Sequence, residues 1–104
     1  MREIGINPGQ MQWEEASGYP RGTRICVLRT DESGMVRAFL LRVGQAFIMG
    51  GHTNTTSEQQ LVLEGEIQGE GETFGRGSYR FIPRGGSHEP WTCGEGAVLF
   101  VTWD

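Results

Sequence analysis

Glycine and proline recur along this chain so often that only short regular elements fit between them. The sequence holds 17 glycines and 4 prolines, and turn signals return roughly every 8–12 residues. Between the turns lie short runs in which apolar and polar residues alternate, as in residues 23–30. No segment keeps a helical period of 3.6 with capping residues. The pattern predicts an all-β chain, folded as a small sandwich or closed barrel.

A chain of 104 residues is the size of one domain. We therefore expect a single domain over residues 1–104. Its first part, residues 1–23, is rich in glycine and proline and is expected to be an N-terminal edge segment with a short strand at 11–16. The remaining residues, 24–104, are expected to form the barrel.

The longer strands of the barrel can be placed from the alternation of apolar residues. They are expected at residues 23–30, 35–43, 58–67, 78–83 and 97–103. The first two flank the turn Asp31–Gly34 and so form a hairpin. The strand at 58–67 contains Gly65, which predicts a bend or a bulge there. Residues 71–77 read as a turn region with Phe74 as a plug. Residues 97–103 are apolar enough to be buried on both faces or at an interface.

Composition excludes several classes of partner. The formal net charge is -4 and no basic run is present, so nucleic acid and anionic membrane are not expected partners. No apolar run approaches the roughly 18 residues of a membrane span, and the N-terminus lacks the apolar core of a signal peptide. Cys26 and Cys93 are read as reduced thiols. Together these features predict a soluble, cytoplasmic protein.

Two stretches contain the residues suited to chemistry. Residues 50–65 hold His52, Asn54 and Glu58, and residues 77–88 end at His88. Two imidazoles and one carboxylate are typical ligands of a transition metal. Alternate residues of a strand share a face, so His52 and Asn54 can point inward together.

The spacing of these residues resembles the paired motifs of the cupin superfamily. The first stretch reads H-x-N-x3-E-x6-G and the second reads G-x5-P-x-G-x2-H. The chain is also similar to the cupin-like zinc domain of certain anti-sigma factors and to small cupin dioxygenases. The resemblance implies a double-stranded β-helix, or jelly-roll barrel, with a divalent metal ion (Fe, Mn, Ni or Zn) in its mouth. It implies that the ligands are His52, Glu58 and His88, with Asn54 at the fourth position.

Three positions depart from the cupin pattern. Asn54 stands where a second histidine is expected, Ala46 where a glycine is expected, and Thr92 where an asparagine is expected. The first departure leaves two interpretations open. Asn54 either hydrogen-bonds a metal-bound water, which leaves a two-histidine, one-carboxylate site suited to Fe(II) and dioxygen, or it marks a degraded site with weak or no metal binding.

Several further residues are candidates for the lining of a pocket. Gln60 is expected to be a polar group beside the metal ligands, or else an ordinary strand glutamine. The other candidates are apolar or aromatic, and they are expected to be core residues more than contacts of a ligand. They are Met49, Tyr79, Phe81, Trp91 and Trp103.

Two functions remain open. The first is a mononuclear metal enzyme that acts on a small organic molecule with dioxygen, and the second is a non-catalytic metal-binding or ligand-binding sensor module. No attached helical sigma-binding segment is expected, which disfavours an anti-sigma role. The chain has no phosphate loop, nucleophile elbow or catalytic triad. The apolar runs at 38–41 and 97–101 exceed what one face of a small barrel needs, so we expect a homodimer.

Overall fold

The computed structural model describes residues 3–44, 47–49, 52–69, 71–88 and 91–104 of the chain. For residues 47, 49, 52–53 and 87–88 it describes the backbone alone. Ala46 lies outside these residues. The described residues form strands and one short 3-10 helix, η1 (Pro8–Gln10). No helix in this part of the chain is long and apolar enough to cross a membrane.

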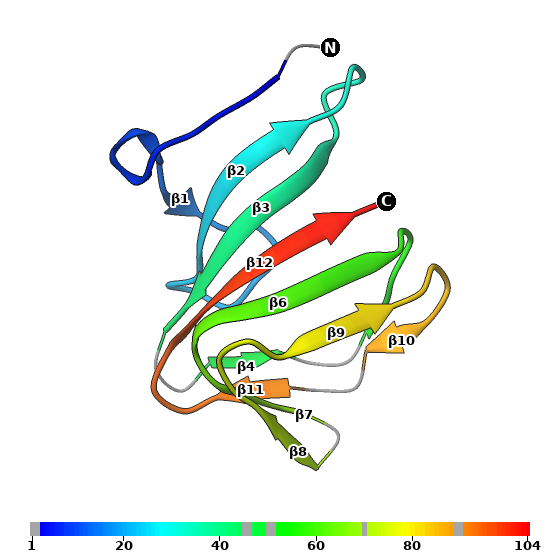
Figure 1. Ribbon diagram of the computed structural model, residues 1–104. Coiled ribbons are helices and arrows are strands. Elements are labelled where there is room, and N and C mark those ends of the chain that lie inside the picture. Colours follow the sequence, from blue (N-terminus) through cyan, green and yellow to red (C-terminus); the bar gives the residue numbers. More distant parts are fainter. Residues whose placement is uncertain (1–2, 45–46, 50–51, 70, 89–90) are drawn as a thin grey trace.

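The largest unit is a six-stranded antiparallel sheet (Figure 1). Its strands, from one edge to the other, are β1 (Glu14–Glu15), β2 (Arg24–Thr30), β3 (Val36–Val43), β12 (Ala97–Trp103), β6 (Glu58–Gly65) and β9 (Tyr79–Ile82). The predicted hairpin is present as β2 and β3, and the predicted edge strand as β1. The last strand, β12, is central because it pairs with both β3 and β6.

Two smaller units gather at one end of this sheet (Figure 1). One is a four-stranded sheet in the order β4 (Phe47–Met49), β11 (Trp91–Cys93), β7 (Ile67–Gly69) and β8 (Glu72–Phe74). The other is the pair of β5 (His52–Thr53) and β10 (Ser87–His88). This all-β arrangement of antiparallel sheets is consistent with the jelly-roll fold expected from the sequence.

The core lies between the facing sheets. From the six-stranded sheet, Phe39, Leu41 and Leu99 are almost fully buried, and from the smaller sheet Ile67 and Trp91 pack against them. Apolar side chains on alternate positions therefore meet across the sandwich and exclude water, which is the main stabilising term of such a fold. Trp91 thus belongs to the core.

The bend expected at Gly65 is confirmed. The pairing of β12 with β6 shifts register between Val98 and Leu99, close to this glycine. Gly65 has a φ of 72°, and a Cβ there would lie 2.2 Å from the carbonyl oxygen of Gly96. Only glycine fits this position without displacing the backbone.

The turn region expected at residues 71–77 is only partly correct. Residues Glu72–Phe74 form β8, which pairs with β7 so that Phe74 lies opposite Ile67. The hairpin turns near Gly71, whose φ is 76°, and pairing then continues past the turn. Phe74 packs against the core as expected.

The outward face of the six-stranded sheet is also largely apolar. Cys26, Ala38 and Leu40 are buried there, and an apolar cavity of about 310 Å³ lies between this face and the N-terminal segment. The cavity is lined by Ile4, Ile6, Met11, Leu28, Arg29, Ala38 and Phe100. Residues 4–11 therefore cover part of this outward face, for which the sequence indicated no covering element.

Candidate functional site

The two sequence stretches meet as neighbouring strands. In the pair of β5 and β10, His52 lies opposite His88 and Thr53 lies opposite Ser87. The ladder continues beyond the strands, because Asn54 N donates to Gly86 O at 3.0 Å and Gly85 N donates to Asn54 O at 3.0 Å. The side chains of His52 and His88 lie outside the described residues.

The turn that returns the chain into β10 depends on glycine. Gly86 N donates to Pro83 O at 2.8 Å, and Gly85 has a φ of 79°. A Cβ on Gly86 would lie 2.9 Å from the same carbonyl oxygen. The proline and the two glycines therefore close a tight turn that sets His88 across from His52.

Glu58 is a buried carboxylate at the start of β6, with only 6% of its surface exposed. Its Oε1 accepts a hydrogen bond from Trp103 Nε1 at 2.9 Å. Its Oε2 accepts one from Gln60 Nε2, and Gln60 Oε1 in turn accepts from Arg80 Nη1 at 3.3 Å. These two hydrogen bonds fix the orientation of the Glu58 carboxylate.

Gln60 therefore lies where the sequence predicted a polar neighbour of the ligand. It is 4% exposed and shares the inward face of β6 with Glu58 and Val62. Through its amide, the positive charge of Arg80 is connected to the carboxylate.

Among the described residues, Asn54 has a buried amide nitrogen without a hydrogen-bond partner. The residue is 8% exposed, and its Nδ2 has no hydrogen-bond partner in the described part of the chain. A buried polar group left unpaired costs about 1–3 kcal/mol. Such an atom is a sign of a ligand, because rotation of the amide can present either a donor or an acceptor to a bound group.

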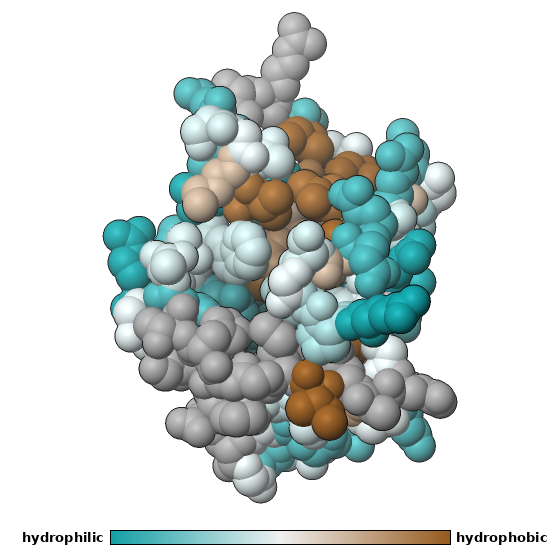
Figure 2. Space-filling model, turned by 180° about the vertical axis from the view of Figure 1, so that it is seen from behind, coloured by the Kyte–Doolittle hydropathy of each residue, from teal (hydrophilic) through white to brown (hydrophobic). Residues whose placement is uncertain are grey.

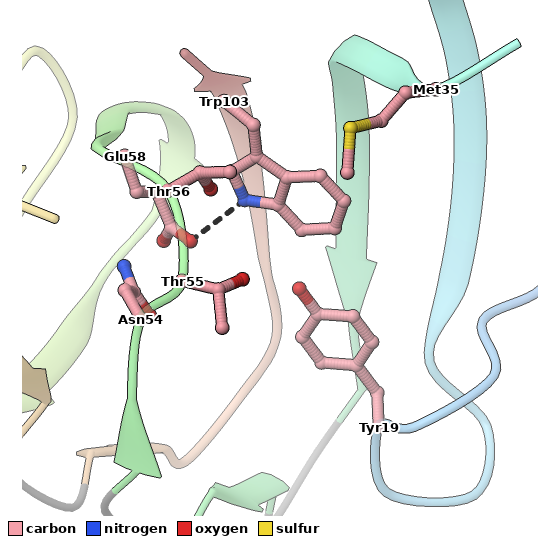
Figure 3. A pocket seen from close by; sticks show the side chains of 7 residues that line it. All are labelled: Tyr19, Met35, Asn54, Thr55, Thr56, Glu58 and Trp103. Carbon is pink, nitrogen blue, oxygen red and sulfur yellow. Dashed lines mark hydrogen bonds between the residues drawn. The ribbon is translucent and has the colours of Figure 1, made fainter. Parts of the chain in front are cut away.

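A cavity of about 220 Å³ lies against Glu58 and Asn54 (Figure 3). It is lined by Tyr19, Met35, Asn54, Thr55, Thr56, Glu58 and Trp103. Tyr19 comes from the loop between β1 and β2, whereas Asn54 to Thr56 follow β5. Burial, and then the negative charge of Glu58, raise the pKa of Tyr19 well above its ordinary value of 10.0.

The lining of the cavity is mixed, with polar side chains and with aromatic and aliphatic ones. Seen from behind (Figure 2), apolar residues gather in the upper half of the molecule. The hairpin of β2 and β3, in the same half, has Val27 and Met35 at 36% and 47% exposure. The cavity therefore combines a polar floor with aromatic and aliphatic walls, as small-molecule sites do.

Two residues that were expected to line the pocket, Tyr79 and Phe81, lie on the surface instead. Tyr79 and Phe81 are 57% and 55% exposed. They pair with Leu61 and Gln59, on the outward face of β6, because the inward positions of β9 are taken by Arg80 and Ile82. The prediction that Tyr79 and Phe81 line the pocket is wrong.

The other pocket candidates have different positions. Met49 lies opposite Trp91 in the pairing of β4 with β11, and its side chain is outside the described residues. Trp103 lines the cavity and packs its ring against Phe39, with centroids 4.7 Å apart. The position of Tyr19 at the cavity was not predicted from the sequence, because a tyrosine between Gly18 and Pro20 in an irregular segment belongs to no motif.

The described residues supply only part of a donor set for a divalent transition metal, and among them no group of three or more His, Cys, Asp or Glu side chains could hold an ion. Glu58 supplies an oriented carboxylate, Asn54 supplies an unpaired amide, and the strand register brings the backbone of both histidines into direct opposition. A site of imidazole and carboxylate ligands suits Fe, Mn, Ni or Zn rather than Mg or Ca.

Comparisons with known proteins agree with this architecture. The ChrR cupin-like domain family matches residues 1–103, whereas the search of curated protein sequences gives no significant match. An RmlC-like cupin from Shewanella frigidimarina is 20% identical, with 98% of this chain and 90% of that chain covered and a TM-score of 0.77.

Two further solved structures are similar. For an acetylacetone dioxygenase from Acinetobacter johnsonii the identity is 12%, the coverage is 99% of this chain and 73% of that one, and the TM-score is 0.75. A chain in the complex of Rhodobacter sphaeroides SigE with the anti-sigma ChrR is 22% identical. The match covers 94% of this chain and 52% of that chain, with a TM-score of 0.73. Such identities show a shared fold, and the family match over almost the entire sequence shows that this chain belongs to the ChrR cupin-like domain family.

Proposed function

We propose that this chain is a metal-binding cupin whose single divalent metal ion is held by His52, Glu58 and His88. The observation that carries the proposal is the strand register, in which His88 lies opposite His52. Asn54 lies two residues after His52, just beyond the end of β5 where the ladder continues, and belongs to the same face of the ladder by strand alternation. The Asn54 side chain lines the cavity together with Glu58.

The chain's own residues define what this site does. Trp103 and Gln60 hold the two oxygens of Glu58 in a fixed orientation, and such support of a ligand typically matters tenfold or more for metal affinity. The cavity admits a small molecule next to Glu58 and Asn54. A bound metal would supply Lewis acidity and a template for that molecule. We propose that the reaction is the oxidation of a small organic molecule by dioxygen.

Oxygen uptake by the Fe(II)-loaded protein tests the enzymatic proposal. We expect uptake with at least one member of a panel of diketones, phenols and thiols, and we expect Glu58→Ala to abolish it. Glu64→Ala removes an exposed carboxylate from the same strand and serves as the matched control. No uptake by the Fe(II) form across the panel would count against the enzyme.

A second candidate function is a non-catalytic sensor module. The family match favours it, because the family is described by ChrR, which is an anti-sigma protein in the Rhodobacter sphaeroides complex. The change Asn54→His distinguishes the two functions, because it adds an imidazole at the fourth position. In an enzyme it lowers turnover while metal binding is kept or tightened, whereas in a sensor it tightens metal binding and no oxygen uptake exists to lose.

A further inference from the structure

Several hydrogen-bond donors line the cavity beside Glu58, and two of them, Tyr19 and Asn54, come from different elements. Figure 3 shows Tyr19 and Asn54 on opposite sides of it. Among the seven lining residues drawn there, the only hydrogen bond joins Trp103 to Glu58. The Tyr19 hydroxyl takes part in none of these contacts, and Asn54 Nδ2 is buried without a partner in the described part of the chain.

The Tyr19 hydroxyl is a donor at every ordinary pH. The phenol of a tyrosine is protonated and neutral near pH 7, because its ordinary pKa is about 10. A protonated phenol and an amide N–H both donate a hydrogen bond to an oxygen acceptor. A molecule that offers such an oxygen would relieve the unpaired state of Asn54.

Size and charge narrow the class of ligand further. The cavity, at about 220 Å³, is larger than the roughly 150 Å³ cavity that holds benzene in another protein, so one substituted ring fits. The charged side chain among the described lining residues is Glu58, which repels an anionic ligand. Tyr19, Met35 and Trp103 supply aromatic and aliphatic walls that favour an apolar body.

We propose that this cavity binds a small uncharged molecule with one carbonyl or hydroxyl oxygen, and that Tyr19 and Asn54 both donate to that oxygen. The proposal deepens the proposed function, since it names the ligand class of the same site and makes Tyr19 the specificity-determining residue. It places the oxygen-bearing end of the ligand beside Glu58.

Three probe molecules of similar size test the ligand class. Acetophenone has a carbonyl oxygen, toluene lacks one, and benzoate is anionic. Binding is measured by ligand-observed NMR titration, both on protein as purified and after treatment with a chelator. We expect acetophenone to bind at least fivefold more tightly than toluene, as the loss of neutral hydrogen bonds predicts, and benzoate to bind most weakly to the metal-free protein.

Matched tyrosine variants test the role of Tyr19. We expect Tyr19→Phe to weaken acetophenone binding about fivefold and to leave toluene binding unchanged, because one hydrogen bond is lost and the ring remains. Tyr79→Phe is the control, since Tyr79 is exposed and its hydroxyl bonds to Gln59 on the outward face. In Asn54→Ala, measured without metal, acetophenone binding should weaken by a similar factor.

Equal affinity for acetophenone in the wild type and Tyr19→Phe would overturn the proposal, as would toluene or benzoate binding as tightly as acetophenone. Circular dichroism shows whether Tyr19→Phe folds. If it does not fold, Asn54→Ala is used instead, and an acetophenone affinity equal to that of the wild type would again overturn the proposal. The proposed function fails separately: a chain without metal affinity can still bind acetophenone, and a chain that ignores all three probes can still bind metal.

Discussion

At the scale of single residues, the site is organised around the carboxylate of Glu58. Its donors come from Gln60, two residues away, and from Trp103, which is 45 residues away. The spacing of the motif identified Glu58, and strand alternation identified Gln60. The sequence named Trp103 only as one of several pocket candidates and did not indicate Tyr19, because contacts between distant segments leave no local signal in a single sequence.

The indole N–H of Trp103 is expected to support metal binding. In Trp103→Phe the bond to Glu58 Oε1 is lost, so the carboxylate is less well oriented and metal affinity falls about tenfold. Isothermal titration with Zn(II) measures this. Trp13→Phe is the control, because Trp13 stacks under the guanidinium of Arg42, 4.4 Å from its ring centroid. Identical affinities in Trp103→Phe and wild type would contradict the role of Trp103.

At the scale of elements, the longer strands could be predicted and the short ones could not. Alternation located β2, β3, β6, β9 and β12 to within a few residues, because runs of several residues show a period of two. Strands of two or three residues, such as β5, β8 and β10, are too short to show one. Alternation also predicts that Tyr79 and Phe81 share one face of their strand, but it does not tell whether that face points inward or outward. The pairing of β9 with β6 shows that it points outward.

The bulge in β6 depends on Gly65. Gly65→Ala should destabilise the fold by about 3 kcal/mol, because it combines a positive φ with a Cβ 2.2 Å from a backbone oxygen. Gly71→Ala shares the positive φ but meets nothing within 4 Å, so it should cost only about 1 kcal/mol. Urea denaturation compares the two, and similar midpoints would show that the contact with Gly96 is unimportant.

The hairpin of β2 and β3 carries a pH dependence at Asp31. Hydrogen bonds from the Ser33 hydroxyl and the Arg37 guanidinium hold the pKa of Asp31 well below its ordinary value of 3.8. Because the folded pKa is lowered, the stabilisation is present above about pH 4 and is lost as the pH falls below it. Asp31→Asn should therefore lower the urea midpoint at pH 7 and lessen its fall between pH 4 and pH 2.

Glu32→Gln is the control for Asp31, since it removes a carboxylate from the same turn. We expect its urea midpoint to follow that of the wild type at both pH values. If Asp31→Asn lost as much stability on acidification as the wild type, another carboxylate would be responsible for the acid sensitivity.

At the scale of the whole molecule, the cupin architecture followed from two motifs in the right order, and the family match agrees with it. The apolar run at 38–41 proved to be covered within the chain, by the core on one face and by N-terminal residues on the other. The N-terminal residues that provide this cover show no periodic pattern from which their position could have been predicted. The homodimer stays a prediction, which light scattering at tens of micromolar tests; Tyr79 and Phe81, exposed on the outward face, leave apolar surface for it.

The central claim is that this chain binds one divalent transition metal ion. Elemental analysis of protein purified without chelator tests it most directly, together with melting curves after metal is added back. We predict about one ion per chain and a higher melting temperature with metal, because the ion binds the folded state. A preparation that is free of metal and shows no melting shift with excess Fe(II), Mn(II), Ni(II) or Zn(II) would contradict the claim.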